Sequence, residues 1–329
     1  MITLKDPITI QNLKLKNRLV MPPMATSKAG EDGMVNRSHI DYYHDKTKSG
    51  KIGLVIMEHV YVSPEGKANP GQVYFGDPSG LDSLKKLTGT VHGSGTPIFA
   101  QISHAGSKAK QAVTGLQPVS ASPVCCPSRQ GPGDMPRELS KEEIRQLVQA
   151  FKNAALLAKE AGFDGVEIHS AHGYLLNQFY SPLTNKRNDE YGGSLMNRIR
   201  IHLEIIEAVR QAVGKDFPVA LRLGAVEDLE NGNTVQDAVE ACQAFEKAGV
   251  DLLDISGSFL GYIRDGHPEP GYFASASKTV KENVSVPVIV TGGIQTSGEA
   301  DILLQQEAAD LIGVGRAILA DSDWPEKNL

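Results

Sequence analysis

The chain is 329 residues long and carries a formal net charge of −6, with 40% hydrophobic and 22% charged residues. A chain of this length buries one large core, and since α/β barrels commonly reach this size as one unit, we expect a single domain over residues 1–329. The charges form no basic stripe, the N-terminus holds no basic segment followed by an apolar one, and no apolar run approaches about 20 residues, so we expect a cytoplasmic protein without a nucleic-acid or membrane partner.

In chain order the sequence begins with a hairpin over residues 3–15, turning at Gln11 and Asn12, for which we expect a structural role at one end of the fold. Apolar, β-branched runs then alternate with helical periodicities. One phrase recurs at residues 160–169, 246–256 and 306–315: a helix ends at Ala-Gly or Ala-Ala, and a tight turn leads into an apolar strand. Glycine tolerates the positive φ angle of such a turn, and an unbroken apolar run is typical of a parallel strand covered on both faces.

This alternation predicts eight strands. Three belong to the recurring phrase, and the other five are expected at residues 19–21, 53–60, 97–103, 218–223 and 286–291. The helices between them are expected at residues 37–49, 81–91, 141–160, 195–213, 235–247, 273–283 and 298–306. Ser140 and Glu143 form a capping box before the longest helix. Strands that alternate with helices in this way favour an α/β fold of the (β/α)8 TIM barrel type, with a doubly wound open sheet as the alternative.

One long stretch, residues 104–139, is rich in glycine, proline and serine and is expected to be irregular. A loop of this length in a compact fold is usually functional, and this loop follows the third strand on the side where barrels carry their chemistry. It contains Cys125 and Cys126. Together with Cys242 they are too few for a disulfide framework or a zinc cluster, and adjacent cysteines rarely reach disulfide geometry, so we expect ordinary reduced thiols.

The expected C-terminal ends of the strands carry many polar groups. Buried polar groups need partners, so a ring of amides, imidazoles and a guanidinium around one mouth indicates a polar ligand or a dense internal network. The residues at these ends are Met24, Ala25, Thr26, Glu58, His59, Gln101, His104, His169, His172, Tyr174, Arg222, Ser256, Gly292, Gly293, Gly315 and Arg316.

The last two strands end in glycines and a cation. Gly292 and Gly293 follow the seventh strand, and Gly315 and Arg316 follow the eighth. Glycine is common in any turn, but two such segments with an arginine match the place and the chemistry of the phosphate site that barrels often build here. The sequence therefore predicts a ligand that carries a phosphate group.

His169, His172 and Tyr174 form a third cluster. No carboxylate or cysteine stands at ligand spacing beside them, so a metal site is disfavoured. Two imidazole N–H groups that converge on one oxygen are suited to stabilise an enolate in a dry pocket, and a phenol nearby is suited to donate a proton. The alternative is that both histidines are structural and find their partners within the core.

Four segments carry a resemblance to a known family: KNRLVMPPM at residues 16–24, QISHAG at 101–106, GFDGVEIHSAHGYLLNQF at 162–179 and SPLTNKRNDEYGG at 181–193. With these segments the chain resembles the old yellow enzymes, also called NADH:flavin oxidoreductases. The resemblance extends from the first strand to Asp321.

The resemblance implies bound FMN. The flavin ring would lie against Pro23, Met24 and Ala25, with Gln101 at its pyrimidine edge. Arg222 would face N1 and O2, where a fixed cation stabilises the reduced flavin.

The resemblance also assigns the phosphate and the chemistry. The glycine segments, with Gly292, Gly293 and Gly315, would hold the phosphate together with Arg316. His169 and His172 would bind the substrate carbonyl oxygen, and Tyr174 would protonate the α-carbon after flavin N5 delivers hydride to the β-carbon.

Two residues depart from the family pattern. Ala25 stands where relatives usually have a threonine or cysteine that touches flavin O4, and His59 stands where a small residue is common. We group His59 with the flavin-site residues, since either change could alter the flavin potential or narrow the pocket.

We therefore expect an FMN-dependent oxidoreductase that uses NADH or NADPH to reduce the C=C bond of α,β-unsaturated carbonyl compounds. The cysteine cluster and dinucleotide-binding domain of larger relatives do not appear in the sequence, so we expect the nicotinamide to visit the same pocket as the substrate. The alternatives are a flavin-dependent oxidative demethylase and a low-turnover flavin redox sensor. The expected partners are a small enone or enoate and, as in relatives, further copies of the chain. Arg264 and His267, in the loop at residues 259–272, either contact an acidic substrate or are loop charges exposed to solvent.

Overall fold

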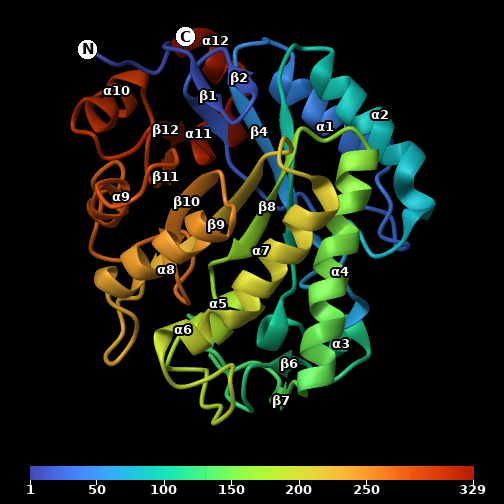
Figure 1. Ribbon diagram of the computed structural model, residues 1–329. Helices are drawn as coiled ribbons and strands as arrows, with labels where there is room; N and C mark the ends of the chain where they lie inside the picture. Colours follow the sequence, from blue (N-terminus) through green and yellow to red (C-terminus); the bar gives the residue numbers. More distant parts are fainter. Residues whose placement is uncertain (130) are drawn as a thin grey trace.

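A computed structural model of the chain describes residues 1–129 and 131–329 (Figure 1). Eight parallel strands close into a barrel, in which each strand pairs with the next one along the chain and the last pairs with the first. This confirms the (β/α)8 TIM barrel and excludes the open sheet. The strands are β3 (Leu19–Met21), β4 (Leu54–Tyr61), β5 (Ile98–Ser103), β8 (Gly165–Ser170), β9 (Val219–Val226), β10 (Leu252–Gly257), β11 (Val288–Thr291) and β12 (Leu311–Gly313).

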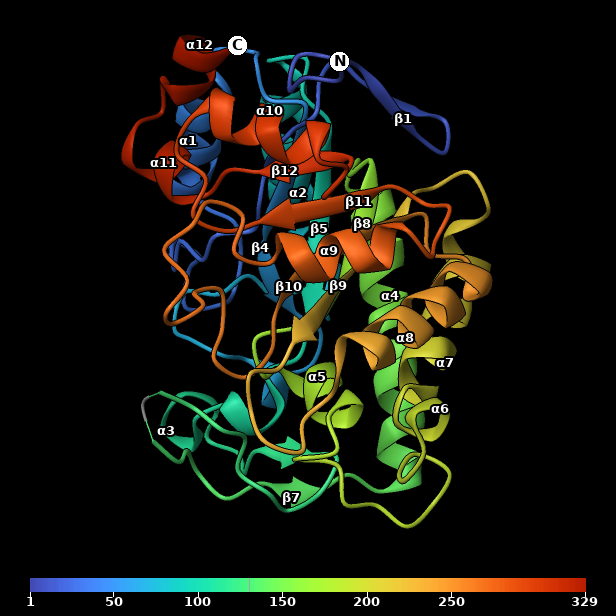
Figure 2. The ribbon, with the colours of Figure 1, turned by 90° about the vertical axis from the view of Figure 1, so that its left-hand side faces the viewer.

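Helices follow the strands and surround the barrel (Figures 1 and 2). Within the described residues, none of them is long and apolar enough to cross a membrane. The longer helices are α1 (Arg37–Thr47), α2 (Leu81–His92), α4 (Lys141–Glu160), α7 (Arg200–Val213), α8 (Val235–Ala248), α9 (Ala274–Lys281) and α10 (Ser297–Gln305). The shorter ones are α3 (Gln111–Thr114), α5 (Leu175–Tyr180), α6 (Leu195–Arg198), α11 (Arg316–Ala320), α12 (Trp324–Asn328) and the 3-10 turns η1 (Pro64–Gly66), η2 (Pro78–Gly80) and η3 (Gly106–Lys108).

The prediction of one continuous helix over residues 195–213 is wrong. The chain breaks at Ile199, which has φ −91° and ψ 1° and separates α6 from α7. The buried guanidinium of Arg198 donates to the backbone oxygens of Tyr180 at 2.7 Å and Gly193 at 2.8 Å, and to Asn233 Oδ1 at 2.9 Å. These tertiary bonds hold the end of α6 and override the helical periodicity of the sequence.

The predicted capping box at the start of α4 is present. The Ser140 hydroxyl accepts from the Glu143 N–H at 3.3 Å, and the Glu143 carboxylate accepts from the Ser140 N–H at 2.8 Å. Two N–H groups that the helix leaves free are thereby satisfied.

The turns of the recurring phrase need a positive φ angle. Gly162 at +84° leads from α4 into β8, and Gly249 at +110° leads from α8 towards β10. The third copy of the phrase has no glycine, and there Glu307 adopts a φ of +57°. All three turns thus have a residue at positive φ, although the third has no glycine to favour it.

The hairpin closes one end of the barrel. β1 (Ile8–Ile10) and β2 (Leu13–Leu15) pair antiparallel, with Gln11 at φ 51° in the predicted turn. Ile10 and Leu15 are fully buried against a layer of side chains inside the barrel. This layer consists of Val20, Leu54, Ile56, Phe99, Ala220, Leu252, Ile289 and Leu311.

The stretch at residues 104–139 is more regular than predicted. It contains η3, α3 and the short strands β6 (Val119–Ser120) and β7 (Arg137–Glu138), which pair with each other. In Figures 1 and 2 these elements lie at the bottom, whereas the hairpin and both termini lie at the top. As predicted, the stretch covers the end of the barrel at which the strands terminate.

The role of the hairpin can be tested by a large-to-small substitution. Ile10→Ala is expected to lower the free energy of unfolding by about 2–5 kcal/mol, because the lost side chain leaves a cavity beneath the barrel core. Urea unfolding followed by circular dichroism measures the change. Thr9→Ala, which alters an exposed side chain of the same strand, is the control. Equal stability of the two variants would show that the hairpin does not seal the barrel.

Candidate active site

A cavity of about 840 Å³ opens at the C-terminal ends of the strands. Its volume lies within the range of roughly 300–1,000 Å³ that is typical of small-molecule sites. Every residue that the sequence assigned to catalysis or to the cofactor lines this one cavity: Pro23, Met24, Ala25, His59, Gln101, His169, His172, Tyr174, Arg222, Gly292, Gly293, Gly315 and Arg316.

Gln101 is held by a buried carboxyl group. Gln101 on β5 lies opposite Glu167 on β8, and its Nε2 donates to Glu167 Oε1 at 2.7 Å. Glu167 Oε2 is buried without a hydrogen-bond partner among the described residues. Burial and the neighbouring Asp254 raise the pKa of Glu167, and Arg222 and the bond from Gln101 only partly oppose this. The site thus favours the protonated form of Glu167.

Arg222 on β9 is the central cation of the site. It lies opposite Asp254 on β10, and Arg222 Nε is 3.0 Å from Asp254 Oδ2. Its Nη2 atom lies 3.4 Å from the Ser256 hydroxyl, which in turn is 2.8 Å from His172 Nε2. A continuous chain of contacts therefore joins the ion pair to His172.

His169, His172 and Tyr174 meet in one wall of the cavity. The ring centroids of His169 and His172 are 5.1 Å apart, and those of His169 and Tyr174 are 5.0 Å apart. His172 follows β8 with a φ of +58°, in the left-handed region, where histidine, asparagine and aspartate are the commonest residues after glycine. Backbone in this region is frequent at functional sites.

The protonation states of these three groups follow from burial. Burial lowers the pKa of His169 and His172, and the charge on Arg222 lowers both further. Burial raises the pKa of Tyr174. The wall therefore presents two neutral imidazoles and a protonated phenol at neutral pH.

His59 contacts Tyr174. It lies at an irregularity of β4, where the pairing with β5 shifts register between Met57 and Val60. His59 Nε2 is 3.1 Å from Tyr174 Oη. Burial lowers the pKa of His59 to about 4, although the adjacent Glu58 raises it. The sequence placed His59 with the flavin site, and in the structure its side chain meets the phenol.

The loop after β3 brings Pro23, Met24 and Ala25 to the cavity, and it is anchored from behind. The next residue, Thr26, donates its N–H to Glu58 Oε2 at 2.5 Å and its hydroxyl to Glu58 Oε1 at 2.7 Å. His39 on α1 contacts the same Oε1 atom. The neighbouring strand thus fixes the position of the loop.

The far end of the cavity is built by glycine backbone and Arg316. A Cβ atom on Gly292 would stand 2.7 Å from the Tyr272 ring, so close packing as well as the φ of +148° requires glycine. The N–H groups of Gly293 and Gly315 donate to no acceptor within the described part of the chain. Arg316 is exposed, and its Nη2 lies 3.3 Å from Tyr272 Oη. Free N–H donors beside a cation make this end suitable for an anion.

Sequence reasoning missed several residues of the site. Glu167 and Asp254 interrupt apolar strands, and that interruption was a signal of a buried polar network. Lys108 is the last residue of η3, beyond the end of β5, and gave no signal in the sequence. Its Nζ atom donates to the backbone oxygens of His172 at 2.7 Å and Phe259 at 3.2 Å.

The cysteines are free, as predicted. Cys126 is buried in the cavity wall, and burial raises the pKa of its thiol. Cys125 is partly exposed and lies outside the cavity lining.

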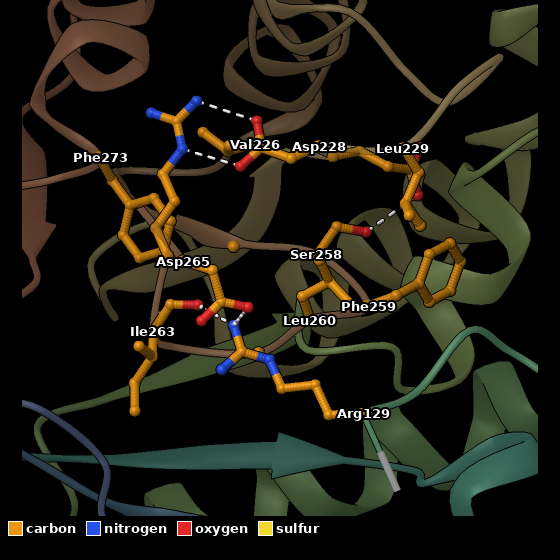
Figure 3. A pocket seen from close by; sticks show the side chains of 14 residues that line it. Arg129, Val226, Asp228, Leu229, Ser258, Phe259, Leu260, Ile263, Asp265 and Phe273 are labelled. Atoms are coloured by element: carbon orange, nitrogen blue, oxygen red, sulfur yellow. Dashed lines mark hydrogen bonds and ion pairs between the residues drawn. The ribbon is translucent and has the colours of Figure 1, made fainter. Parts of the chain in front are cut away.

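The charges of the loop at residues 259–272 are paired within the chain. Arg264 makes two bonds to Asp228, at 2.8 and 2.9 Å, and His267 Nδ1 lies 2.7 Å from Glu269 Oε1. Arg129 lies 3.1 Å from Asp265 at a second pocket of only about 20 Å³ (Figure 3). These pairs fit loop charges better than contacts to an acidic substrate.

Comparison with known proteins places this geometry in a family. The sequence model of the NADH:flavin oxidoreductase / NADH oxidase family matches residues 3–328. An NADH oxidase of Thermoanaerobacter brockii is 42% identical over 97% of this chain and 49% of its own length. A metal reductase of Desulforamulus reducens is 38% identical over 99% of this chain and 48% of its own length. The chain thus spans about half the length of these curated relatives.

Solved structures with this fold include three enzymes, each 28% identical over 99% of the chain. A complex of 2-naphthoyl-CoA reductase with 2-naphthoyl-CoA gives a TM-score of 0.94 over 52% of that protein. An old yellow enzyme homologue from Zymomonas mobilis gives 0.86 over 92%. Morphinone reductase in complex with tetrahydroNAD gives 0.85 over 90%.

The raised pKa of Glu167 predicts a pH-dependent effect of Glu167→Gln. Above the ordinary pKa of 4.5, the unfolded chain has lost this proton while the folded chain still holds it. The free energy of unfolding of the parent therefore falls as pH rises towards the folded pKa, by up to about 1.4 kcal/mol per pH unit, and the neutral glutamine removes this loss.

Urea unfolding of both proteins at pH 5, 6 and 7 is expected to show a growing advantage for Glu167→Gln. Glu282→Gln, which changes an exposed glutamate, controls for the loss of one titrating group. A constant difference between parent and Glu167→Gln at all three pH values would contradict a protonated Glu167.

Proposed function

This chain belongs to the NADH:flavin oxidoreductase / NADH oxidase family, the family of the old yellow enzyme, and we propose that it reduces the C=C bond of α,β-unsaturated carbonyl compounds. Members of the family bind FMN and use NADH or NADPH. One observation carries the proposal: two neutral imidazoles, His169 and His172, and one protonated phenol, Tyr174, meet in the wall of one cavity. Such a set can bind a carbonyl oxygen and protonate a carbon beside it.

The residues at the far end of the cavity fit the phosphate of FMN. The free N–H groups of Gly293 and Gly315 and the charge of Arg316 supply donors for a terminal phosphate. Gly292 places its backbone at the same end, where a side chain would collide with Tyr272.

The middle of the cavity fits the flavin ring. Pro23, Met24 and Ala25 would lie against the ring, Gln101 would meet its pyrimidine edge, and Arg222 would balance negative charge near N1 and O2. Bound FMN supplies the carrier that takes hydride from the nicotinamide and gives it to the substrate. Ala25 offers no hydroxyl or thiol to the ring.

His169 and His172 hold the substrate carbonyl oxygen. Each neutral imidazole donates an N–H, and the two donors stabilise the negative charge that develops on this oxygen. The Ser256 hydroxyl orients the His172 ring, and the Lys108 ammonium donates a hydrogen bond to the backbone oxygen of His172. These donors therefore have their positions before the substrate binds.

Tyr174 protonates the α-carbon. Its pKa is raised by burial, so the phenol is fully protonated at neutral pH and available as a neutral acid. The tetrahydroNAD and 2-naphthoyl-CoA complexes of the two solved relatives support a nicotinamide reductant and a conjugated carbonyl substrate at a site of this kind.

Arg316→Ala is expected to weaken FMN binding roughly 10- to 100-fold, since a charge-assisted contact to phosphate contributes about 1.5–3 kcal/mol. Titration of apoprotein with FMN, followed by quenching of flavin fluorescence, measures the dissociation constant. Arg129→Ala is the matched control, because Arg129 lines the same cavity but pairs with Asp265. Unchanged affinity in Arg316→Ala would remove this residue from the phosphate site.

Tyr174→Phe keeps the ring and removes the acid. Anaerobic rapid mixing of the reduced enzyme with 2-cyclohexenone is expected to give rates roughly 10²–10⁴-fold below the parent, the usual contribution of a positioned general acid. Reduction of the flavin by NADH or NADPH should remain close to the parent rate. The rate of nitroalkene reduction should fall less in this variant, because hydride transfer alone yields a nitronate that leaves before it is protonated.

Tyr262→Phe provides the control for this experiment, since Tyr262 is an exposed phenol whose neighbour in the site is His172, at a centroid distance of 6.2 Å. Parental enone reduction by Tyr174→Phe would assign the proton to another donor. The rate of NADH consumption is also measured in air without enone. This rate reports an oxidase activity, for which the Thermoanaerobacter brockii relative is named, separately from enone reduction.

A further inference from the structure

We propose that His59 returns to Tyr174 the proton that this phenol gives to the substrate, so that a relay of two side chains leads from solvent to the α-carbon. The inference rests on the proposed function, because it takes Tyr174 as the proton donor. It is carried by the hydrogen bond between the two rings and by the place of His59 in the cavity wall.

Among the described side chains, His59 is the hydrogen-bond partner of the Tyr174 hydroxyl, with Nε2 at 3.1 Å. The rings meet edge to face, with centroids 5.4 Å apart. Once the phenol has lost its proton, a phenolate would remain in the half-buried cavity wall, and its proton must be replaced before the next turnover. The neighbour that can donate to it is the imidazole of His59.

An imidazole is suited to this task because its two nitrogens face different surroundings. Nε2 of His59 faces Tyr174, whereas Nδ1 has no partner among the described residues. The ring is partly exposed and lines the cavity, so water can reach it from that side. A proton can enter at Nδ1 while another leaves from Nε2.

The irregularity of β4 creates this contact. The register between β4 and β5 shifts between Met57 and Val60, and this shift turns the His59 ring into the cavity while Glu58 faces Thr26. Without an imidazole at this position, the phenol would lack the partner that the structure gives it.

The proton balance is simple. The Tyr174 O–H bond breaks as a C–H bond forms at the α-carbon, and the His59 Nε2–H bond breaks as the phenol O–H bond forms again. His59 Nδ1 takes a proton from water, and exchange with solvent restores the starting tautomer. One solvent proton joins the substrate, and no electrons move in this part of the reaction.

His59 works as a relay and not as a stored acid, because it is neutral at working pH. The titratable groups near it are Glu58 on its own strand and His169, His172 and Tyr174 across the cavity. Burial lowers its pKa to about 4, although Glu58 opposes this shift. A neutral ring can still pass protons between its nitrogens.

The test compares the FMN-loaded parent with His59→Gln and His59→Ala. Glutamine keeps an N–H donor for Tyr174 but cannot pass a proton through the side chain, and alanine removes both functions. Each protein is supplied, without air, with an excess of NADPH and 2-cyclohexenone, and enone reduction over many turnovers is measured in H₂O and in D₂O. The rate of flavin reduction by NADPH in each variant serves as its own reference.

We expect both variants to reduce 2-cyclohexenone over many turnovers roughly 10- to 100-fold more slowly than the parent, with a larger solvent isotope effect, because Tyr174 must regain its proton in every cycle. Added imidazole should partly restore His59→Ala. N-methylimidazole, which has one nitrogen blocked, should not restore it. A parental rate in His59→Gln would show that a hydrogen-bond donor suffices and would overturn the relay. Equal rescue by the two imidazoles would overturn it as well.

A second measurement is independent of turnover. In ¹⁵N-histidine NMR spectra of the loaded protein, the His59 signals should report a neutral ring with Nε2 bonded to Tyr174, and this signature should change in Tyr174→Phe. If the parent does not reduce cyclohexenone, the proposed function fails while this signature still stands. If the spectrum is the same in Tyr174→Phe, the relay fails whatever the activity of the parent.

Discussion

The site is built around the buried ion pair of Arg222 and Asp254. A guanidinium that is only 3% exposed would cost several kcal/mol without a partner, and Asp254 at 3.0 Å supplies the counter-charge. One negative charge suffices for this pairing, and burial then holds the second carboxyl, Glu167, in its protonated form. After burial itself, Arg222 is the next largest influence that keeps His169 and His172 neutral. Arg222 thus adds to burial in keeping both histidines neutral, while burial alone raises the pKa of Tyr174.

The parallel register of the barrel makes this arrangement possible. Gln101 lies opposite Glu167, His169 lies opposite Arg222, and Arg222 lies opposite Asp254. The register therefore gives two neighbouring polar rows, Gln101 with Glu167 and His169 with Arg222 and Asp254, and together they form a polar layer drawn from four strands. The hairpin fills the opposite end with Ile10 and Leu15, and the polar layer therefore lies at the open end.

The sequence predicted the barrel because its signals are local. Apolar runs and the turns at Gly162 and Gly249 can be read from neighbouring residues, and polar residues at strand ends then indicate one shared mouth. The break at Ile199 could not be read in this way, because the contacts of Arg198 with distant loops cause it. The strands β6 and β7 have two residues each and no periodicity. The contact of His59 with Tyr174 depends on a register shift that no local pattern records.

The proposed chemistry follows from the charge that the cavity already contains. Arg222 and Lys108 bring positive charge to the wall, so an imidazolium there would add a third cation to a poorly solvated site. Neutral imidazoles avoid this cost and still donate N–H groups to a carbonyl oxygen, whose developing negative charge the two cations favour. The proton donor must also be an acid in its neutral form, and a phenol satisfies this condition where an imidazolium does not. When the phenol of Tyr174 releases its proton, the resulting phenolate is an anion among cations, which makes the release easier. A neutral imidazole beside the phenolate can then restore the proton without adding net charge.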